Sequence, residues 1–378
     1  MKHINRLFLF LLGALVFVGC KKDDGTLNTR VSAVKTIFSP ADNYTANLSN
    51  ISSVLFEWDQ ARAEDGGIVL YTVVFAKADG NFDKPLYTIS SDGNGLQNKA
   101  TLDKSTLNKI GKLAGLQSLQ SGDFKWTVFS SKGVNVMPAD SSRKITIIRP
   151  SDFDHQPAQL YLTGSATEGG TDLAKALKVK QIDVDHYEIY TSLKAGTYHF
   201  VDKTSGSEIH QYYIENNMIL EGDKESTIEG GAAKPYRISL DLGVKTTKLF
   251  EIKELGLWFA PNNKIQFTLN YDKNGTWIAN NELVTFKQES WGGDERYKFR
   301  MQVNDGTADA YEWWGSINGD NSRATSSSPA SYFFLLPAPA NQWDNCYKFQ
   351  TEADKAHCDF MVSFSSDIEN YTHKVTIK

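Results

Sequence analysis

Short apolar segments separated by turns rich in glycine, asparagine and aspartate dominate the chain from residue 34 onward. The segments at 54–58, 69–76, 124–129 and 144–148 are rich in β-branched and aromatic residues. Such residues favour strands, and several short strands with turns between them are typical of an immunoglobulin- or fibronectin-like sandwich. The pattern therefore predicts an N-terminal β-sandwich domain over residues 34–150.

One segment inside this region has helical spacing instead. Leucine and isoleucine side chains recur every three residues from Leu107 to Leu119. That spacing predicts a short helix or a helical crossover over residues 105–119, with Ser105 as the N-cap.

Strand-like segments resume at residue 160, after a polar linker at 151–157, and continue to the C-terminus. The blocks 158–251 and 252–378 show a similar order of segments, which suggests a repeated module. We therefore expect an all-β fold with three tandem β-sandwich domains, the second and third formed by these two blocks.

The start of the chain has the pattern of an export signal. Lys2 and Arg6 precede an unbroken apolar run at 7–18. This run is shorter than the roughly 20 residues that a membrane-spanning helix needs. We predict a signal peptide over residues 1–19, followed by a flexible tether at 20–33.

Gly19-Cys20 resembles the lipobox of bacterial lipoproteins, in which the cysteine receives a lipid and becomes the mature N-terminus. We expect lipidation of Cys20 and attachment to a membrane through acyl chains. The alternative is cleavage nearby, with Cys20 an incidental thiol. Asp23-Asp24 also resembles the surface-export signal of Bacteroidetes lipoproteins, so the body is expected outside the outer membrane.

The net charge bears on binding to nucleic acid, and the cysteine content bears on disulfide formation. The net charge is −5, so there is no basic footprint for nucleic acid. Once Cys20 is assigned to the lipid, Cys346 and Cys358 remain. An exported chain permits a disulfide between them, whereas the alternative is two small buried thiols.

Motifs for metal binding and catalysis are weak. His186, His199 and His210 are widely spaced and lack a ligand motif, so zinc is not expected. Asp272 starts a stretch similar to a calcium loop, but the closing glutamate is missing and a plain turn is favoured. We predict no cofactor, with calcium left open. No serine-nucleophile or phosphate-loop motif occurs, and we predict no enzymatic activity.

Several loose motifs occur in a characteristic order. They are Gly19-Cys20, Phe56-Glu57-Trp58, Gly66-Gly67, Tyr71-Thr72-Val73, and the stretches at 124–128 and 160–167. This order resembles the SusE/SusF family of Bacteroidetes starch-utilisation lipoproteins. The resemblance implies that the second and third blocks are sandwiches similar to carbohydrate-binding modules.

The same resemblance implies a surface glycan-binding protein without catalytic activity. Such proteins work beside a TonB-dependent transporter and a SusD-like lipoprotein at the outer membrane. The middle block has no tryptophan, so some polysaccharide or oligosaccharide is expected rather than starch in particular. The alternative is a structural or interaction lipoprotein of an outer-membrane complex, without a glycan site of its own.

Six of the eight tryptophans lie between residues 258 and 343, which directs the search for a sugar site to the third block. Sugar rings have flat apolar faces rimmed by hydroxyls, so a site needs an exposed aromatic ring with polar groups at its edge. In a strand through this block, Tyr311, Trp313 and Ile317 share one face and are expected inward. Trp314 then faces outward as the preferred platform.

Loops supply further candidates. Trp291 and Trp343 lie in loops and are expected to be exposed, and a polar loop after residue 317 offers side chains for hydroxyl contacts or forms a plain turn. The predicted glycan-binding residues are Trp314, Trp291, Trp343, Trp313, Tyr311, Asn318, Asp320 and Arg323. The strand patterns place Trp58, Trp126, Trp258 and Trp277 in cores.

Overall fold

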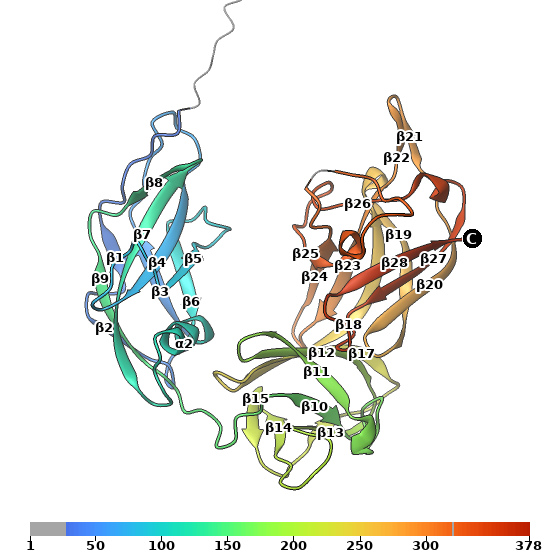
Figure 1. Ribbon diagram of the computed structural model, residues 1–378, viewed down its shortest axis with the longest axis horizontal. Helices are drawn as coiled ribbons and strands as arrows, with labels where there is room; N and C mark the ends of the chain where they lie inside the picture. Colours follow the sequence, from blue (N-terminus) through green and yellow to red (C-terminus); the bar gives the residue numbers. More distant parts are fainter. Residues whose placement is uncertain (1–27, 320) are drawn as a thin grey trace, which may run out of the picture. The chain divides into compact units, whose positions relative to one another are not determined.

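The computed structural model describes residues 28–319 and 321–378 (Figure 1). The predicted signal peptide, the lipidation site Cys20 and much of the predicted tether lie outside the described residues, as does Asp320. Strands dominate the rest of the chain, so the predicted all-β fold class is confirmed. The division into three tandem sandwiches stays a prediction.

Contacts divide the chain into two compact units. The N-terminal unit consists of residues up to 46, 53–102 and 123–146. The larger unit consists of residues 47–52, 103–122 and 147–378. Within the part of the chain that the structure describes, no helix is long and apolar enough to cross a membrane.

Two sheets build the N-terminal unit. Phe56 on one sheet contacts Phe75 and Trp126 on the other, with ring centroids 5.6 and 4.6 Å apart, and all three rings are buried. The first sheet has the order β1 (Ile37–Ser39), β3 (Ser53–Trp58), β6 (Lys99–Asp103). The second has the order β2 (Tyr44–Asn47), β9 (Arg143–Ile148), β7 (Ser121–Lys132), β4 (Leu70–Lys77), β5 (Tyr87–Ser90), with β8 (Asn135–Pro138) paired to β7.

The α-helix α2 (Lys104–Leu113) follows β6. The side chain of Asp103 accepts a hydrogen bond from the Thr106 N–H at 2.8 Å, so Asp103 and not the predicted Ser105 is the N-cap. The predicted extension to Leu119 is wrong, because Gly115 adopts a φ of 91° and ends the helical path.

A path of 17 hydrogen-bonded strands runs through the larger unit. We call residues 160–251 the middle module and residues 252–378 the C-terminal module. The strand β18 (Thr246–Phe259) crosses between them, because residues 246–251 pair with β17 (Lys234–Asp241) and residues 251–259 pair with β23 (Arg296–Asn304). The predicted boundary after residue 251 falls inside this continuous strand.

The other elements of the larger unit follow in chain order. Those of the middle module are β10 (Leu160–Thr163), η2 (Leu173–Lys175), β11 (Leu177–Asp183), β12 (His186–Leu193), β13 (Gly196–Val201), β14 (Gln211–Glu215), β15 (Met218–Glu221), β16 (Ser226–Ile228) and β17 (Lys234–Asp241). Those of the C-terminal module are η3 (Ala260–Asn262), β19 (Lys264–Lys273), β20 (Thr276–Leu283), β21 (Lys287–Glu289), β22 (Gly292–Asp294), β23 (Arg296–Asn304), β24 (Asp309–Gly315), η4 (Ala330–Phe333), β25 (Leu336–Pro337), β26 (Tyr347–Lys348), η5 (Thr351–Ala353), β27 (His357–Ser363) and β28 (Thr372–Ile377).

Buried side chains also join the two modules. Tyr190 of β12 belongs to the core of the C-terminal module and stacks on Phe364, with ring centroids 4.7 Å apart. The hydroxyl of Tyr371 donates to buried Glu188 at 2.5 Å. The middle and C-terminal modules are therefore packed against each other as well as being joined by β18.

Candidate functional site

The outer face of β23 carries three basic residues in a row. Side chains alternate between the two faces of a strand, and Phe299 and Met301 are buried in the core. Arg296, Lys298 and Arg300 therefore share the opposite face, along a length of about 13 Å. Each of these cations lies against an aromatic ring.

Arg296 stacks on Trp343 at one end. The guanidinium carbon lies 4.2 Å from the centroid of the Trp343 ring. Nε and Nη2 of Arg296 donate to the Asp294 carboxylate at 2.9 and 2.5 Å. Burial raises the pKa of Asp294, but hydrogen bonds from Arg296 outweigh burial and leave that pKa below its usual value. Trp343 is 42% exposed, so the pair positions the ring without covering it.

Lys298 fixes the loop that carries this tryptophan. The side chain is fully buried, and Nζ donates to the backbone carbonyls of Pro339, Asn341 and Asp344 at 3.1, 2.6 and 3.2 Å. Desolvation lowers the pKa of Lys298. A buried cation is costly unless it is hydrogen-bonded, so the three carbonyls compensate the charge while the charge holds the loop.

Arg300 lies between two aromatic rings at the other end. Its guanidinium carbon is 4.5 Å from the centroid of the Tyr311 ring and 5.9 Å from that of Trp258, and Nη2 is 3.5 Å from the Glu254 carboxylate. Trp258 meets Trp313 edge to face, with ring centroids 5.0 Å apart. Because Tyr311 is 53% exposed, a phenol ring, a guanidinium and a carboxylate meet at the solvent boundary.

These contacts are connected, since Nζ of buried Lys298 lies 4.9 Å from the centroid of the Trp313 ring, and they leave the Tyr311 and Trp343 rings exposed at the two ends. The surface suits a ligand that has both apolar faces and hydroxyl groups. We call it the β23 ladder, and it consists of Arg296, Lys298, Arg300, Trp258, Trp313, Tyr311 and Trp343.

The predicted orientation of β24 is reversed in the structure. Trp314 is only 7% exposed and packs against Phe364 and Tyr371, with ring centroids 4.8 and 6.2 Å away. The register places Trp314 opposite buried Phe299 of β23, which puts it on the core side, while Tyr311 faces outward. The prediction of Trp314 as an outward platform is therefore wrong.

The remaining predicted residues that the structure describes do not join the ladder. Trp291 is 66% exposed in the turn of the β21–β22 hairpin, which extends from the C-terminal module in Figure 1. Nδ2 of Asn318 donates to Ser316 Oγ at 2.9 Å, and Nε of Arg323 donates to the buried Glu295 carboxylate at 3.0 Å. These two polar groups thus hold their own loop, and contacts from them to a ligand stay a prediction.

Cys346 and Cys358 are free thiols in the structure, so of the two sequence-based alternatives it has the unbridged one. Burial raises the pKa of Cys346 to about 11 and raises that of Cys358. Both thiols are therefore protonated near neutral pH, which leaves them poor nucleophiles.

Sequence reasoning missed four members of the ladder. Trp258 was expected in the core, yet it is half-buried on the outer face, because Leu257 and Phe259 on either side of it point inward. The three basic residues of β23 alternate with buried aromatic and apolar ones. That alternation of charged and apolar positions was the signal available in the sequence.

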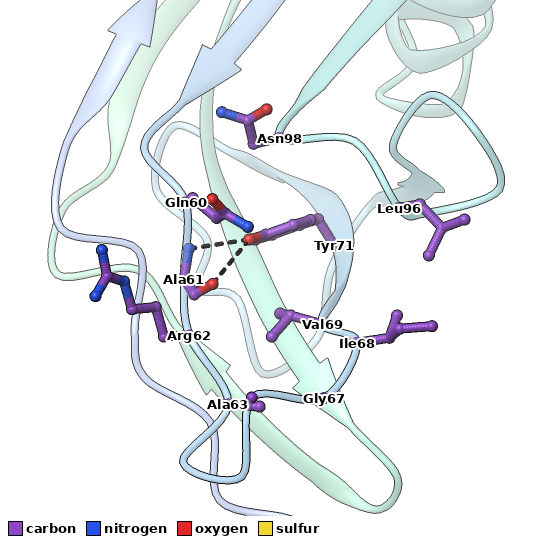
Figure 2. A pocket seen from close by; sticks show the side chains of 11 residues that line it. Gln60, Ala61, Arg62, Ala63, Gly67, Ile68, Val69, Tyr71, Leu96 and Asn98 are labelled. Atoms are coloured by element: carbon purple, nitrogen blue, oxygen red, sulfur yellow. Dashed lines mark hydrogen bonds between the residues drawn. The ribbon is translucent and has the colours of Figure 1, made fainter.

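A separate cavity of about 310 Å³ lies in the N-terminal unit. Figure 2 shows the side chains that line it. It is lined by Gln60, Ala61, Arg62, Ala63, Gly66, Gly67, Ile68, Val69, Tyr71, Leu96 and Asn98. The Tyr71 hydroxyl accepts from the Ala61 N–H at 2.9 Å and donates to the Ala61 carbonyl at 3.3 Å. The aromatic ring of this cavity is therefore used to fix the neighbouring backbone.

Comparison with known proteins adds a family to this description. Residues 22–129 match the family described as SusE outer membrane protein. The crystal structure of SusF from Bacteroides thetaiotaomicron aligns with 92% of this chain and 99% of its own, at 12% sequence identity and a TM-score of 0.29. That score is too low to define a common fold over the alignment. A search of curated proteins found no match.

The strands and the β23 ladder define a sheet-rich protein with an exposed aromatic and cationic surface. The match over residues 22–129 makes this part of the chain similar to the SusE outer membrane protein family, in agreement with the resemblance seen in the sequence motifs. The matched residues, 22–129, include most of the N-terminal unit, whereas the ladder lies outside them.

Proposed function

We propose that this protein is a non-catalytic glycan-binding lipoprotein of the outer membrane that captures a polysaccharide or oligosaccharide on the β23 ladder. The family match to SusE outer membrane proteins supports the setting. The arrangement of rings and charges on the ladder supports the ligand class.

One observation carries the proposal: the exposed rings of the ladder are held by cations. Tyr311 and Trp343 are 53% and 42% exposed, and Arg300 and Arg296 lie against them. The C–H face of a sugar stacks on such a ring, and hydroxyls at its edge bond to guanidinium or carboxylate groups. Because the rings are already ordered, little side-chain entropy is lost when the glycan binds.

The proposed role as a glycan-binding lipoprotein also indicates which partners to expect. A lipid on Cys20 tethers the protein to the outer membrane, with its body facing the exterior. A TonB-dependent transporter and a SusD-like lipoprotein then receive the glycan without any bond being cleaved. Each sugar contact is weak, and tethering near the transporter raises the effective concentration enough to make such contacts useful.

Affinity electrophoresis against a panel of polysaccharides tests the proposal. We expect at least one glycan to retard the protein, and the double change Tyr311→Ala and Trp343→Ala to weaken that retardation tenfold or more, about 1.4 kcal/mol. The matched control is Phe38→Ala, because Phe38 is 54% exposed on the N-terminal unit and lies outside the ladder.

Three results would count against the proposal. If no glycan retards the protein, the interaction-lipoprotein alternative is favoured. If the double variant is retarded as strongly as the parent, the ladder is not the site. If reducing ends accumulate during prolonged incubation with the glycan, the protein is an enzyme.

A further inference from the structure

Two histidines and a glutamate that are far apart in the sequence meet on the middle module. His155 lies in the segment before β10, His210 immediately precedes β14, and Glu221 ends β15. One donor atom from each side chain lies within 4.8 Å of the donor atoms of the other two.

Both imidazoles face the same carboxylate oxygen. Nδ1 of His155 is 2.5 Å from Oε1 of Glu221, and Nδ1 of His210 is 3.9 Å from that oxygen. The two rings stack with centroids 3.7 Å apart and an angle of 14° between their planes. A divalent metal ion would be attracted by all three donors.

Neighbouring hydrogen bonds hold the three donors in place. Oε2 of Glu221 accepts the backbone N–H of His155 at 3.3 Å, which leaves Oε1 directed at the rings. The backbone N–H of His210 donates to Asp202 at 3.0 Å. Tyr212, opposite Glu221 in the β14–β15 pair, donates its hydroxyl proton to the His155 carbonyl at 2.5 Å. Outer contacts of this kind orient ligands in metal sites.

We propose that His155, His210 and Glu221 bind one divalent transition-metal ion, with zinc as the reference ion. Tetrahedral zinc takes nitrogen and oxygen ligands at about 2.0–2.2 Å, which places ligand atoms about 3.4 Å from one another. His210 therefore moves toward the carboxylate, and the rings tilt apart because the metal lies near each imidazole plane. Nδ1 of His155 moves away from Oε1 of Glu221, from 2.5 Å to about 3.4 Å, and the exposure of the His155 side chain permits this. Imidazole donors disfavour the hard cations calcium and magnesium.

Such an ion ties the segment at 151–157 to β14 and β15. Three protein ligands leave a fourth position on the ion for water or for a donor atom from another molecule. The inference does not depend on the glycan site, because none of the three ligands lies in the C-terminal module, from whose residues the β23 ladder is built.

Titration of tag-free, metal-stripped protein with zinc chloride in a calorimeter tests this site. We expect one ion per chain with a dissociation constant below about 10 µM. His210→Ala and Glu221→Gln should each weaken binding tenfold or more. The matched control is His199→Ala, since His199 and Glu225 form a two-residue pair at 3.2 Å. This control should bind zinc like the parent.

Cobalt supplies a second readout, because tetrahedral Co²⁺ absorbs visible light and His210→Ala should lose that absorption. Because the His155 side chain is 56% exposed, His155→Ala should keep the fold, and a loss of binding there should reflect the missing ligand. The proposal is overturned if the parent shows no saturable binding. It is also overturned if His199→Ala weakens binding as much as His210→Ala does.

Discussion

The middle and C-terminal modules both have an arginine packed against aromatic rings, but one group is buried and the other is open to solvent. In the middle module, Arg237 lies 4.5 Å from the centroid of the Phe250 ring and 5.8 Å from that of Tyr190. Its Nη1 and Nη2 donate to Glu312 at 2.7 and 2.6 Å, and the residue is 9% exposed. The aromatic rings, the Arg237 guanidinium and the Glu312 carboxylate therefore bind one another within the protein.

The corresponding group in the C-terminal module is open. Arg300 is half-buried and its Nη2 is 3.5 Å from Glu254, while the Tyr311 ring against it is 53% exposed. A contact between a cation and a ring therefore does not by itself mark a binding surface. What separates the two modules is whether the ring stays exposed and whether a carboxylate accepts from both Nη atoms of the guanidinium.

The largest expected effect is a loss of unfolding free energy when Arg237, the buried arginine of this comparison, is replaced. Arg237→Ala leaves Glu312 without its partner in a mostly buried setting, which typically costs about 3–5 kcal/mol of unfolding free energy. Arg300→Ala should cost less than about 1 kcal/mol, because the pair it breaks is long and partly solvated. Urea denaturation of both variants measures the difference.

The double change Arg237→Met with Glu312→Leu serves as the control, since removing both charges should recover most of the loss. If Arg300→Ala is as destabilising as Arg237→Ala, both arginines are structural and the contrast between the modules disappears.

Acid should act on a histidine in the core of the C-terminal module. Nδ1 of His373 donates to the Phe333 carbonyl at 2.9 Å, Nε2 accepts from the Tyr297 hydroxyl at 2.8 Å, and the ring is 2% exposed. Burial lowers the pKa of His373 to about 3. Below pH 6.5, His373 is protonated in the unfolded chain but stays neutral in the folded chain. Stability should therefore fall by about 1.4 kcal/mol per pH unit from this group as the pH drops toward 3.

Urea denaturation at pH 7, 5.5 and 4.5 measures this slope, and His373→Gln should reduce it by the equivalent of one proton.

The middle module contains a histidine, His186, whose pKa is shifted in the opposite direction. The hydrogen bond that the His186 ring donates to the Asp241 carboxylate raises the pKa of His186 to about 9, so the stabilisation from His186 is present below pH 6.5 and is lost as the pH rises through 9. An unchanged acid slope in His373→Gln would mean that His373 is protonated in the fold.

A smaller effect is expected at Lys298, and it separates positioning from direct contact. Lys298→Met keeps the buried stem but leaves three loop carbonyls without their donor, at a cost of about 1–3 kcal/mol. The loop at 337–345 should then be cleaved faster by protease, and glycan retardation should weaken because Trp343 loses its fixed position. Trp343→Ala is the control, since it should weaken retardation without exposing the loop. If Lys298→Met changes neither the protease resistance of the loop nor the glycan retardation, Lys298 does not hold the loop.

The sequence allowed the faces of β24 to be separated but not oriented. Alternation placed Tyr311 and Trp313 on one side and Trp314 on the other, and the structure has that division. Which side is buried depends on packing against Phe364 and Tyr371, some 50 residues later in the chain, and no local pattern contains that information. The loop bonds of Lys298 and the meeting of His155 with His210 were out of reach for the same reason.

The smallest expected effect concerns the most exposed tryptophan among the described residues. Trp291 is 66% exposed in the turn of the β21–β22 hairpin, outside the ladder. A flexible, unsupported ring loses more freedom when it binds a ligand than one held by a guanidinium, so it contributes less affinity. Trp291→Ala should therefore change glycan retardation less than twofold, and the unfolding free energy by no more than about 0.5 kcal/mol. Affinity electrophoresis beside Tyr311→Ala measures this. If Trp291→Ala abolishes retardation while Tyr311→Ala does not, exposure alone selects the binding ring, and the cation behind it has no part in recognition.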